Sequence, residues 1–385
     1  MNEIPPVPAP GKNGNGSAER WQPAAEPLVK SSDADELDQA LGQLRSGVWE
    51  QDQWTAFRLR YGVYGQLQPG VQMMRIKVPG GILSFAQARA AAAVTRKYAK
   101  GDLHVTTRQA IQIYHVPTDD TPAAVRDLAA GGLTTREACG NTLRNFTACA
   151  LAGICPREHV DAGRVAEELS RAWLRNPLVQ HMPRKFKTTV SGCGTDCGSS
   201  GIHDLGLIAT VKDGRQGFRV FAGGGTGGQP IAAVEVADFV TEDTLPAVVE
   251  ALVRLHHRYS DRVNRNRARI KFLVKRFGAD KFRALFTEEL ERVRTLPRRP
   301  WEKLAWRTAE EAPAPSSPGG IVHQHDGKSS IIVNPPLGLL SPDALDALIE
   351  IAESAGADHL RTTRDQNIAI IGVPADAAET LAASV

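Results

Sequence analysis

The sequence lacks long apolar runs, a strong net charge and the start of an exported protein, and each absence excludes a class of protein. No apolar stretch approaches the roughly 20 residues that a helix needs to cross a bilayer. The opening, M-N-E-I-P-P-V-P-A-P, has neither the basic residues nor the apolar segment of a secretory signal. The formal net charge of +3 does not indicate a nucleic-acid partner. We therefore predict a cytoplasmic protein with no membrane and no nucleic acid among its partners.

Cysteine is also scarce, with five residues in 385, and the odd number argues against a disulfide framework. Apart from Cys139, they form two tight pairs: Cys149 and Cys155 in T-A-C-A-L-A-G-I-C, and Cys193 and Cys197 in S-G-C-G-T-D-C-G. Sets of four thiolates hold iron–sulfur clusters or zinc. The wide spacing of the first pair suits a zinc knuckle less well than a [4Fe–4S] cluster. We favour the cluster, with structural zinc and buried structural thiols as alternatives.

The chain contains an internal repeat, because residues 81–117 and 338–374 align without a gap at an offset of 257. Each copy predicts a strand, an amphipathic helix and a closing strand. These lie at 72–78, 85–98 and 104–116 in the first copy, and at 330–333, 342–355 and 359–373 in the second. Two related halves of this kind commonly pair about a pseudo-twofold axis and bury their open sheet edges against each other.

Composition divides the chain further. Residues 1–30 are rich in Pro, Gly, Asn and Ser, which is typical of a disordered arm, and 312–320 has the composition of an interdomain linker. We predict half-domains at 31–130 and 321–385 around a cysteine-bearing α/β domain at 131–311, and hence an α+β fold overall. Within the central domain we expect helices at 167–174 and 244–259, and strands at 205–212 and 217–222 joined by an Asp213-Gly214 turn.

Basic residues without obvious acidic partners lie near the cysteines. They are Arg75, Arg108, Arg144, Lys185 and Lys187. Lys185 and Lys187 flank a phenylalanine, so in a strand both would face one side. Any one of these cations alone is more simply interpreted as part of a solvated surface. Together they predict a cationic pocket beside a metal centre, suited to an anionic cofactor or substrate.

Two further segments admit several interpretations. The dense basic run at 256–276 fits a charged helix surface, a nucleic-acid contact or a contact with a polycarboxylate cofactor. The glycine-rich segment 223–228 follows a predicted strand, but no Gly-Lys-Ser/Thr follows it. We therefore predict a tight turn at 223–228 rather than a P-loop.

In combination, these motifs resemble the sirohaem-dependent nitrite and sulfite reductases over about residues 55–385. The motifs are R-I-K-V-P-G-G, T-T-R-Q, G-N-T-L-R-N-x-T-A-C, P-R-K-F-K, S-G-C-x-x-x-C-G, G-G-G and N-R-N-R-A-R-I-K-F-L-V. The resemblance implies two ferredoxin-like half-domains, each followed by a sirohaem and iron–sulfur domain, in agreement with the repeat. A complete member would continue into a second such domain, so we expect this chain to be a fragment or to be completed by a second chain.

The resemblance also implies residue roles. It implies that the sirohaem carboxylates and the oxyanion substrate are bound by Arg75, Arg108, Arg144, Lys185 and Lys187. It also implies that Thr106 contacts a cofactor. It assigns the [4Fe–4S] cluster to Cys149, Cys155, Cys193 and Cys197. The last of these, Cys197, resembles the thiolate that bridges the cluster and the sirohaem iron.

The implied activity is six-electron reduction of sulfite to sulfide or of nitrite to ammonia, with electrons from a ferredoxin-like donor. Nitrite-type members often carry Asn at the position of Lys187, so the extra cation favours the dianion sulfite. The alternative function is a non-catalytic iron–sulfur electron-transfer or interaction subunit of the same fold. A third hypothesis is a zinc-bearing protein that binds nucleic acid.

Overall fold

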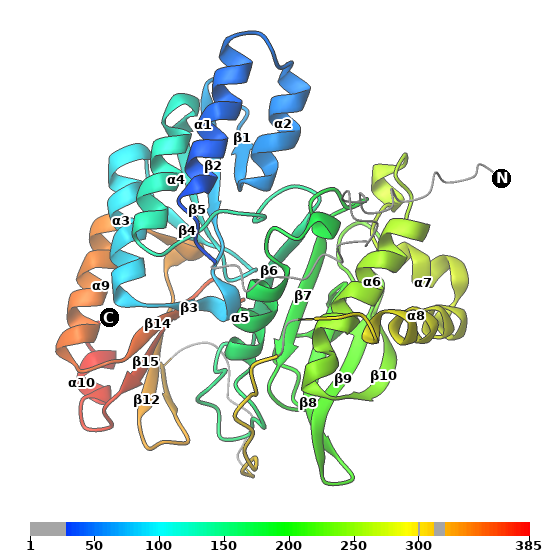
Figure 1. Cartoon of the computed structure of the whole chain (residues 1–385). Coiled ribbons are helices and arrows are strands. Elements are labelled where there is room, and N and C mark those ends of the chain that lie inside the picture. The colour runs from blue at the N-terminus through cyan, green and yellow to red at the C-terminus, as the bar shows by residue number, and fades with distance from the viewer. Residues whose placement is uncertain (1–27, 299–300, 312–319) are drawn as a thin grey trace.

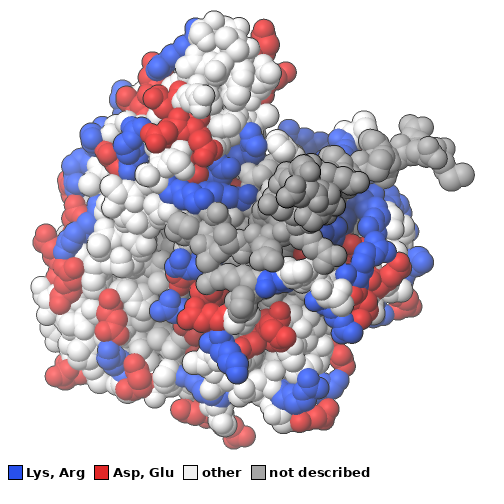
Figure 2. Space-filling view, viewed as in Figure 1, with Lys and Arg blue, Asp and Glu red and all other residues white. Residues whose placement is uncertain are grey.

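The computed structural model describes residues 28–298, 301–311 and 320–385, which form three five-stranded sheets with their covering helices (Figure 1). The predicted arm at 1–30 and linker at 312–320 lie almost entirely outside the described residues. The observed mixture of helices and sheets confirms the predicted α+β class. Figure 2 shows acidic and basic side chains interspersed over one face.

The first half-domain is one sheet covered on one side by helices. Its strands, in spatial order, are β1 Val63–Gly65, β2 Val71–Ile76, β5 Ile111–Pro117, β4 Leu103–Val105 and β13 Leu339–Leu340. Its helices are α1 Ser32–Arg45, α2 Gln51–Arg60, α3 Phe85–Tyr98 and α4 Thr121–Ala130. Alternation along β5 buries Ile111 and Ile113 in the core with Ala88 and Ala92 of α3. The opposite face of the sheet is left for polar side chains.

The second half-domain repeats this arrangement. Its strands, in spatial order, are β11 Gly320–His323, β12 Ser329–Val333, β15 Ile368–Val373, β14 His359–Thr362 and β3 Ile82–Leu83. Its helices are α9 Pro342–Ser354 and α10 Ala378–Ala382. The predicted helix of each copy is confirmed, and in the first copy its bounds agree at both ends.

The two copies exchange short strands. β3 of the first copy pairs with β14, and β13 of the second copy pairs with β4. Gln109 Nε2 donates to Thr362 O at 2.9 Å, and the equivalent Gln366 Nε2 donates to Val105 O at 3.2 Å. Helices α3 and α9 pack side by side (Figure 1). The pseudo-twofold pairing expected from the repeat is confirmed.

The prediction of a single closing strand in each copy is wrong, because the closing segment of each copy forms a hairpin of two strands. In the first copy Gln109 N donates to Thr106 O at 3.0 Å, and Thr106 Oγ1 accepts from Ala110 N at 3.2 Å. Gln109 and its counterpart Gln366 take left-handed φ angles of 54° and 66°. These turns reverse the chain between two apolar runs, so each copy reads β-α-β-β.

The central domain is a mixed sheet. Its strands, in spatial order, are β10 Val234–Val240, β9 Arg215–Ala222, β8 Leu205–Lys212, β7 Phe186–Ser191 and β6 Leu143–Ala148. Its helices are α5 Ala162–Trp173, α6 Leu245–Tyr259, α7 Lys271–Phe277 and α8 Ala279–Arg294. Strands β6, β7 and β8 run parallel, whereas β8, β9 and β10 run antiparallel.

Most local predictions for this domain are confirmed. The β8–β9 turn has left-handed φ angles at Asp213 (51°) and Gly214 (73°), as such hairpins require. The helix predicted at 167–174 begins earlier, because Asp161 caps it by accepting hydrogen bonds from Gly163 N and Arg164 N. None of the described helices is both long and apolar enough to span a bilayer.

Candidate functional site

Arg75 and Arg144 meet where the first half-domain joins β6. Arg75 Nη1 donates to Ala138 O at 3.1 Å, and Arg144 Nη1 donates to the same carbonyl at 2.9 Å. Arg144 also donates from Nε and Nη2 to Gly140 O. Burial, together with Arg75, lowers the pKa of Arg144 to about 10. Two guanidiniums that converge on one carbonyl oxygen leave excess positive charge for an incoming anion.

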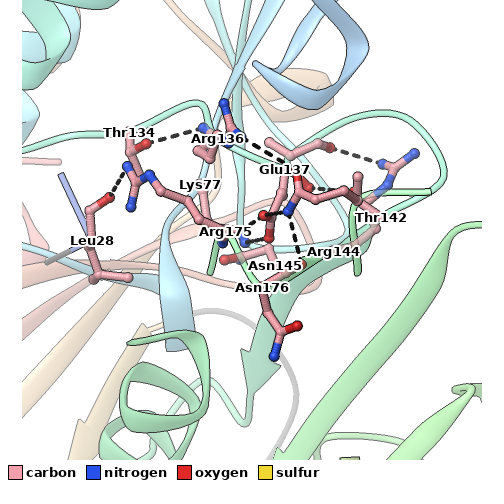
Figure 3. Close-up of polar contacts among 12 residues, drawn as sticks. Leu28, Lys77, Thr134, Arg136, Glu137, Thr142, Arg144, Asn145, Arg175 and Asn176 are labelled. Atoms are coloured by element: carbon pink, nitrogen blue, oxygen red, sulfur yellow. Dashed lines mark hydrogen bonds and ion pairs between the residues drawn. The ribbon is translucent and has the colours of Figure 1, made fainter. Parts of the chain in front are cut away.

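A buried ion pair supports this junction (Figure 3). Lys77 Nζ lies 3.9 Å from Glu137 Oε2, and both side chains are almost fully buried. Glu137 Oε1 also accepts a hydrogen bond from Arg175 N at 2.7 Å. Burial lowers the pKa of Lys77 to about 8 and raises the pKa of Glu137. Glu137 lies on the connection that leads into β6 and Arg144 is the second residue of that strand, so the pair fixes the segment just before Arg144.

Lys185 and Lys187 lie at the start of β7 and are half-buried. Burial, then Arg144 and other neighbouring cations, lowers the pKa of Lys185 to about 8. Burial, then Arg108 and Arg269, lowers the pKa of Lys187 to about 7. Neither ammonium has a hydrogen-bond or ion-pair partner among the described residues. Such cations fit an anionic ligand that is not part of the chain.

Arg108 extends from the β4–β5 turn into the central domain. Its Nη2 donates to Asn145 O and, at 3.0 Å, to Thr188 O, so it joins β6 to β7. Its Nε and Nη1 are buried and have no partner in the described part of the chain. Buried donors of this kind normally have an acceptor, and carboxylates of an anionic cofactor fit them. Thr106 is buried and serves the turn itself, so its cofactor contact stays a prediction.

The four paired cysteines line one cavity of about 170 Å³. Cys149 follows β6 and Cys193 follows β7, and because these strands are parallel their following loops leave the same edge of the sheet. Cys149 and Cys155 are each 8% exposed, Cys193 is half-buried and Cys197 is exposed.

The second half-domain completes the wall of this cavity with Val322, Ile332, Thr363, Arg364, Asp365 and Asn367. Within the described ranges, no three His, Cys, Asp or Glu side chains converge on a point that could hold a single metal ion. The four cysteines line one cavity. Thiols spread around a space fit the separate iron corners of a cluster.

Part of the basic run at 256–276 is internal scaffolding, and the rest of it lies on the surface. Arg269 makes a bidentate contact with Asp204 at 2.9 and 2.7 Å, and Asp204 accepts from Lys187 N at 2.7 Å. Lys271 Nζ donates to the carbonyls of Thr226 and Gln229. Lys271 thus holds the glycine-rich segment 223–228 through its carbonyl oxygens. These contacts agree with a turn rather than a phosphate loop.

Sequence reasoning missed a polar row on the open face of the first sheet. Cross-strand pairing places His104 beside Gln112 and Gln112 beside Arg75. His104 Nδ1 lies 2.7 Å from Tyr114 Oη, and burial lowers the pKa of His104. The sequence did contain a signal for this row, because its polar residues on β4 and β5 alternate with the apolar residues Leu103, Val105, Ile111 and Ile113. Arg364 had no such signal, because only packing brings it to the cysteines.

Two family models match the chain. The family described as "Nitrite and sulphite reductase 4Fe-4S domain" matches residues 139–293. The family described as "Nitrite/Sulfite reductase ferredoxin-like half domain" matches twice, at 64–131 and 322–385. The double match coincides with the internal repeat.

Similar proteins include two curated relatives and one solved structure. An assimilatory ferredoxin-dependent nitrite reductase of Haloferax mediterranei is 33% identical over 87% of this chain and 61% of its own length. A sulfite reductase [ferredoxin] of Mycolicibacterium paratuberculosis is 30% identical over 80% of this chain and 54% of its own length. The chain thus spans little more than half the length of the curated relatives that it matches. The Mycobacterium tuberculosis NirA protein is 26% identical with a TM-score of 0.77, covering 93% of this chain and 69% of that one.

Proposed function

The chain belongs to the sirohaem-dependent nitrite and sulfite reductase family, and we propose that it takes part in six-electron reduction of sulfite to sulfide, with nitrite to ammonia as the second candidate reaction. Membership implies sirohaem and a [4Fe–4S] cluster as cofactors. One arrangement supports the proposal: four thiols line a single cavity, and Arg108, which has buried N–H groups without partners among the described residues, interacts electrostatically with Arg364 in the wall of that cavity. A ferredoxin-like donor and a cytoplasmic location, where thiols stay reduced, complete it.

Cys149, Cys155, Cys193 and Cys197 would hold the cluster, because they line the same cavity and come from neighbouring loops. Cys197 is the most exposed of the four, which supports its assignment as the bridging thiolate. Arg108, with buried unpartnered N–H groups, would hold sirohaem carboxylates together with Arg75 and Arg144. When bound, these cofactors supply electrons and the iron at which the substrate is reduced.

The chain's own cations have two tasks in this reaction. Arg75 and Arg144 would hold the oxyanion and stabilise its charge. Lys185 and Lys187, with pKa values of about 8 and 7, exchange protons near neutral pH, as a proton donor must. Two ammonium groups beside two guanidiniums would favour the dianion sulfite over the monoanion nitrite.

The absorption spectrum of the chain purified without oxygen tests this proposal. Soret and far-red sirohaem bands, with iron and sulfide in the protein, would support it. A broad iron–sulfur shoulder without macrocycle bands would favour the non-catalytic electron-transfer subunit. Zinc without visible colour would contradict both functions.

A further inference from the structure

Two arginines of the second half-domain hold the two cysteine loops. Arg361 Nη1 donates to Ala152 O, between the cysteines of the first pair. Arg364 Nη1 donates to Cys197 O at 2.9 Å. Each cysteine loop is therefore tied by one arginine to a domain that contributes no cysteine ligand.

Arg364 differs from Arg361 because it lines the cysteine cavity itself. Its Nε is buried and has no partner among the described residues. No carboxylate in those residues lies within ion-pair distance of its guanidinium; the adjacent Asp365 is exposed. Asp365 and Asp196 attract the guanidinium of Arg364 without forming an ion pair with it, so its positive charge lies beside the cavity with no carboxylate in contact among the described residues.

The repeat shows that Arg364 is not inherited from a shared turn. At an offset of 257, Arg364 aligns with Thr107, which is exposed in the first copy. The first copy instead places its cation one residue later, at Arg108, which donates to the carbonyls of β6 and β7. The same turn therefore carries a cation toward β6 and β7 in one copy and toward the cysteines in the other.

We propose that Arg364 is a positioning residue of the cysteine site, which anchors the loop of Cys197 and raises the reduction potential of the cluster. The proposal rests on the proposed function, because it requires a cluster in this cavity. Adding an electron makes a cluster more negative, and a nearby cation stabilises that state. Partial burial limits screening by water, and charge and exposure are established determinants of cluster potentials. The second half-domain thus helps to set how readily the cluster accepts an electron.

The test is a potentiometric titration of the iron–sulfur-loaded protein, followed by electron paramagnetic resonance. Arg364→Gln removes the charge, and we expect about a tenfold smaller equilibrium constant for one-electron reduction, a fall of about 59 mV. Arg364→Lys keeps the charge and should largely restore the potential. Arg126→Gln removes an exposed charge that pairs with Asp35 on the first half-domain, and it should leave the potential unchanged.

Hydrogen exchange of the cluster-free protein tests the anchoring separately. Amides at 193–200 should exchange faster in Arg364→Gln than in the wild type or Arg126→Gln, because the contact with Cys197 O is lost. An unchanged potential in a loaded Arg364→Gln protein would overturn the tuning, even if exchange were faster. Unchanged exchange would overturn the anchoring. A wild-type protein that binds no cluster would instead refute the proposed function, and this inference with it.

Discussion

Lys185 and Lys187 show how burial changes what a residue does. An exposed lysine stays charged far above neutral pH, whereas these two have pKa values lowered to about 8 and 7 by burial and by neighbouring cations. A bound anion would restore both charges. Anion binding and proton uptake are therefore coupled at this pocket.

The affinity for an anion should fall as pH rises through 7 to 9. Deprotonation of each lysine removes one attraction, so affinity should drop by up to about tenfold per pH unit for each lysine involved. Nitrite is a suitable probe, because it remains a monoanion throughout this range. Spectral titrations with nitrite at pH 6.5, 7.5 and 8.5 would measure the affinity at each pH. Lys187→Met should flatten the lower part of the profile, and a flat wild-type profile would contradict the coupling.

Replacing Lys187 by asparagine should shift selectivity toward nitrite. Loss of one cation weakens binding of the dianion sulfite more than that of nitrite. We expect the ratio of kcat/KM for sulfite to that for nitrite to fall about tenfold, or about 1.4 kcal/mol. Steady-state rates with both substrates measure this. Lys212→Asn, at an exposed lysine that pairs with Asp238, is the control. An unchanged ratio in Lys187→Asn would rule out this role.

Four of the cysteines are the proposed cluster ligands, and Cys139 is not among them. Serine at any of the four cavity positions should abolish or strongly reduce cluster iron, because each thiolate would hold one corner of the cluster. Cys139 is buried elsewhere, with Sγ 3.6 Å from Gly62 O, so Cys139→Ser should keep full iron content. Iron and sulfide analysis after reconstitution distinguishes the four cavity variants from Cys139→Ser. Iron loss in Cys139→Ser equal to that in the other variants would contradict the assignment.

At the scale of elements, tight turns bring the half-domains against the central domain. The 3-10 helix η1 Pro79–Gly81 packs against α5, and Gly80 has a left-handed φ of 60°. A Cβ on Gly80 would lie 2.8 Å from Gly163 Cα. Its counterpart in the second copy, Leu337, has φ 56° but is 84% exposed. The turn tolerates a side chain where no helix covers it.

Gly80→Ala should therefore destabilise the protein more than a matched glycine replacement. Gly70 has a similar φ of 76°, but nothing lies within 4 Å of its added Cβ. Both variants carry the cost of a left-handed alanine, about 1–2 kcal/mol. Overpacking should add about 1–3 kcal/mol at Gly80 alone. Urea unfolding measures both, and equal losses would show that η1 moves away from α5 without cost.

At the scale of the whole molecule, the cysteine cavity is lined by residues of both the central domain and the second half-domain. Arg361 and Arg364 cross this boundary, and Val322 and Ile332 line the cavity from the second half-domain. A cluster in the cavity would contact both domains at once. It should therefore stabilise their association as well as the cysteine loops.

Cluster reconstitution should raise the melting temperature. A ligand that binds only the folded state adds about 2.7 kcal/mol at 100 times its Kd. Calorimetry of cluster-free and reconstituted protein measures the shift. Cys149→Ser, treated identically, should show little or none. Equal melting temperatures of wild-type protein with and without cluster would contradict a shared cavity.

Much of this molecule could be predicted from local sequence. The apolar periodicity gave helix 85–98, the Asp213-Gly214 pair gave a hairpin, and the offset of 257 gave the duplicated half-domains. The hairpins within each copy were missed, because the polar T-T-R-Q turn lies between runs that both fit a strand. Local patterns do not show where such a run reverses.

The sequence by itself determined the elements, the repeat and the residue types of the site, because these depend on spacing and composition along the chain. Only the tertiary structure decided which side chains meet. The parallel pairing of β6 and β7 brings the two cysteine loops together, and exchange of β3 and β13 fixes the second half-domain against the first. Arg364 reaches Cys197 across 167 residues. Contacts over such separations depend on packing of whole elements, which no local pattern encodes.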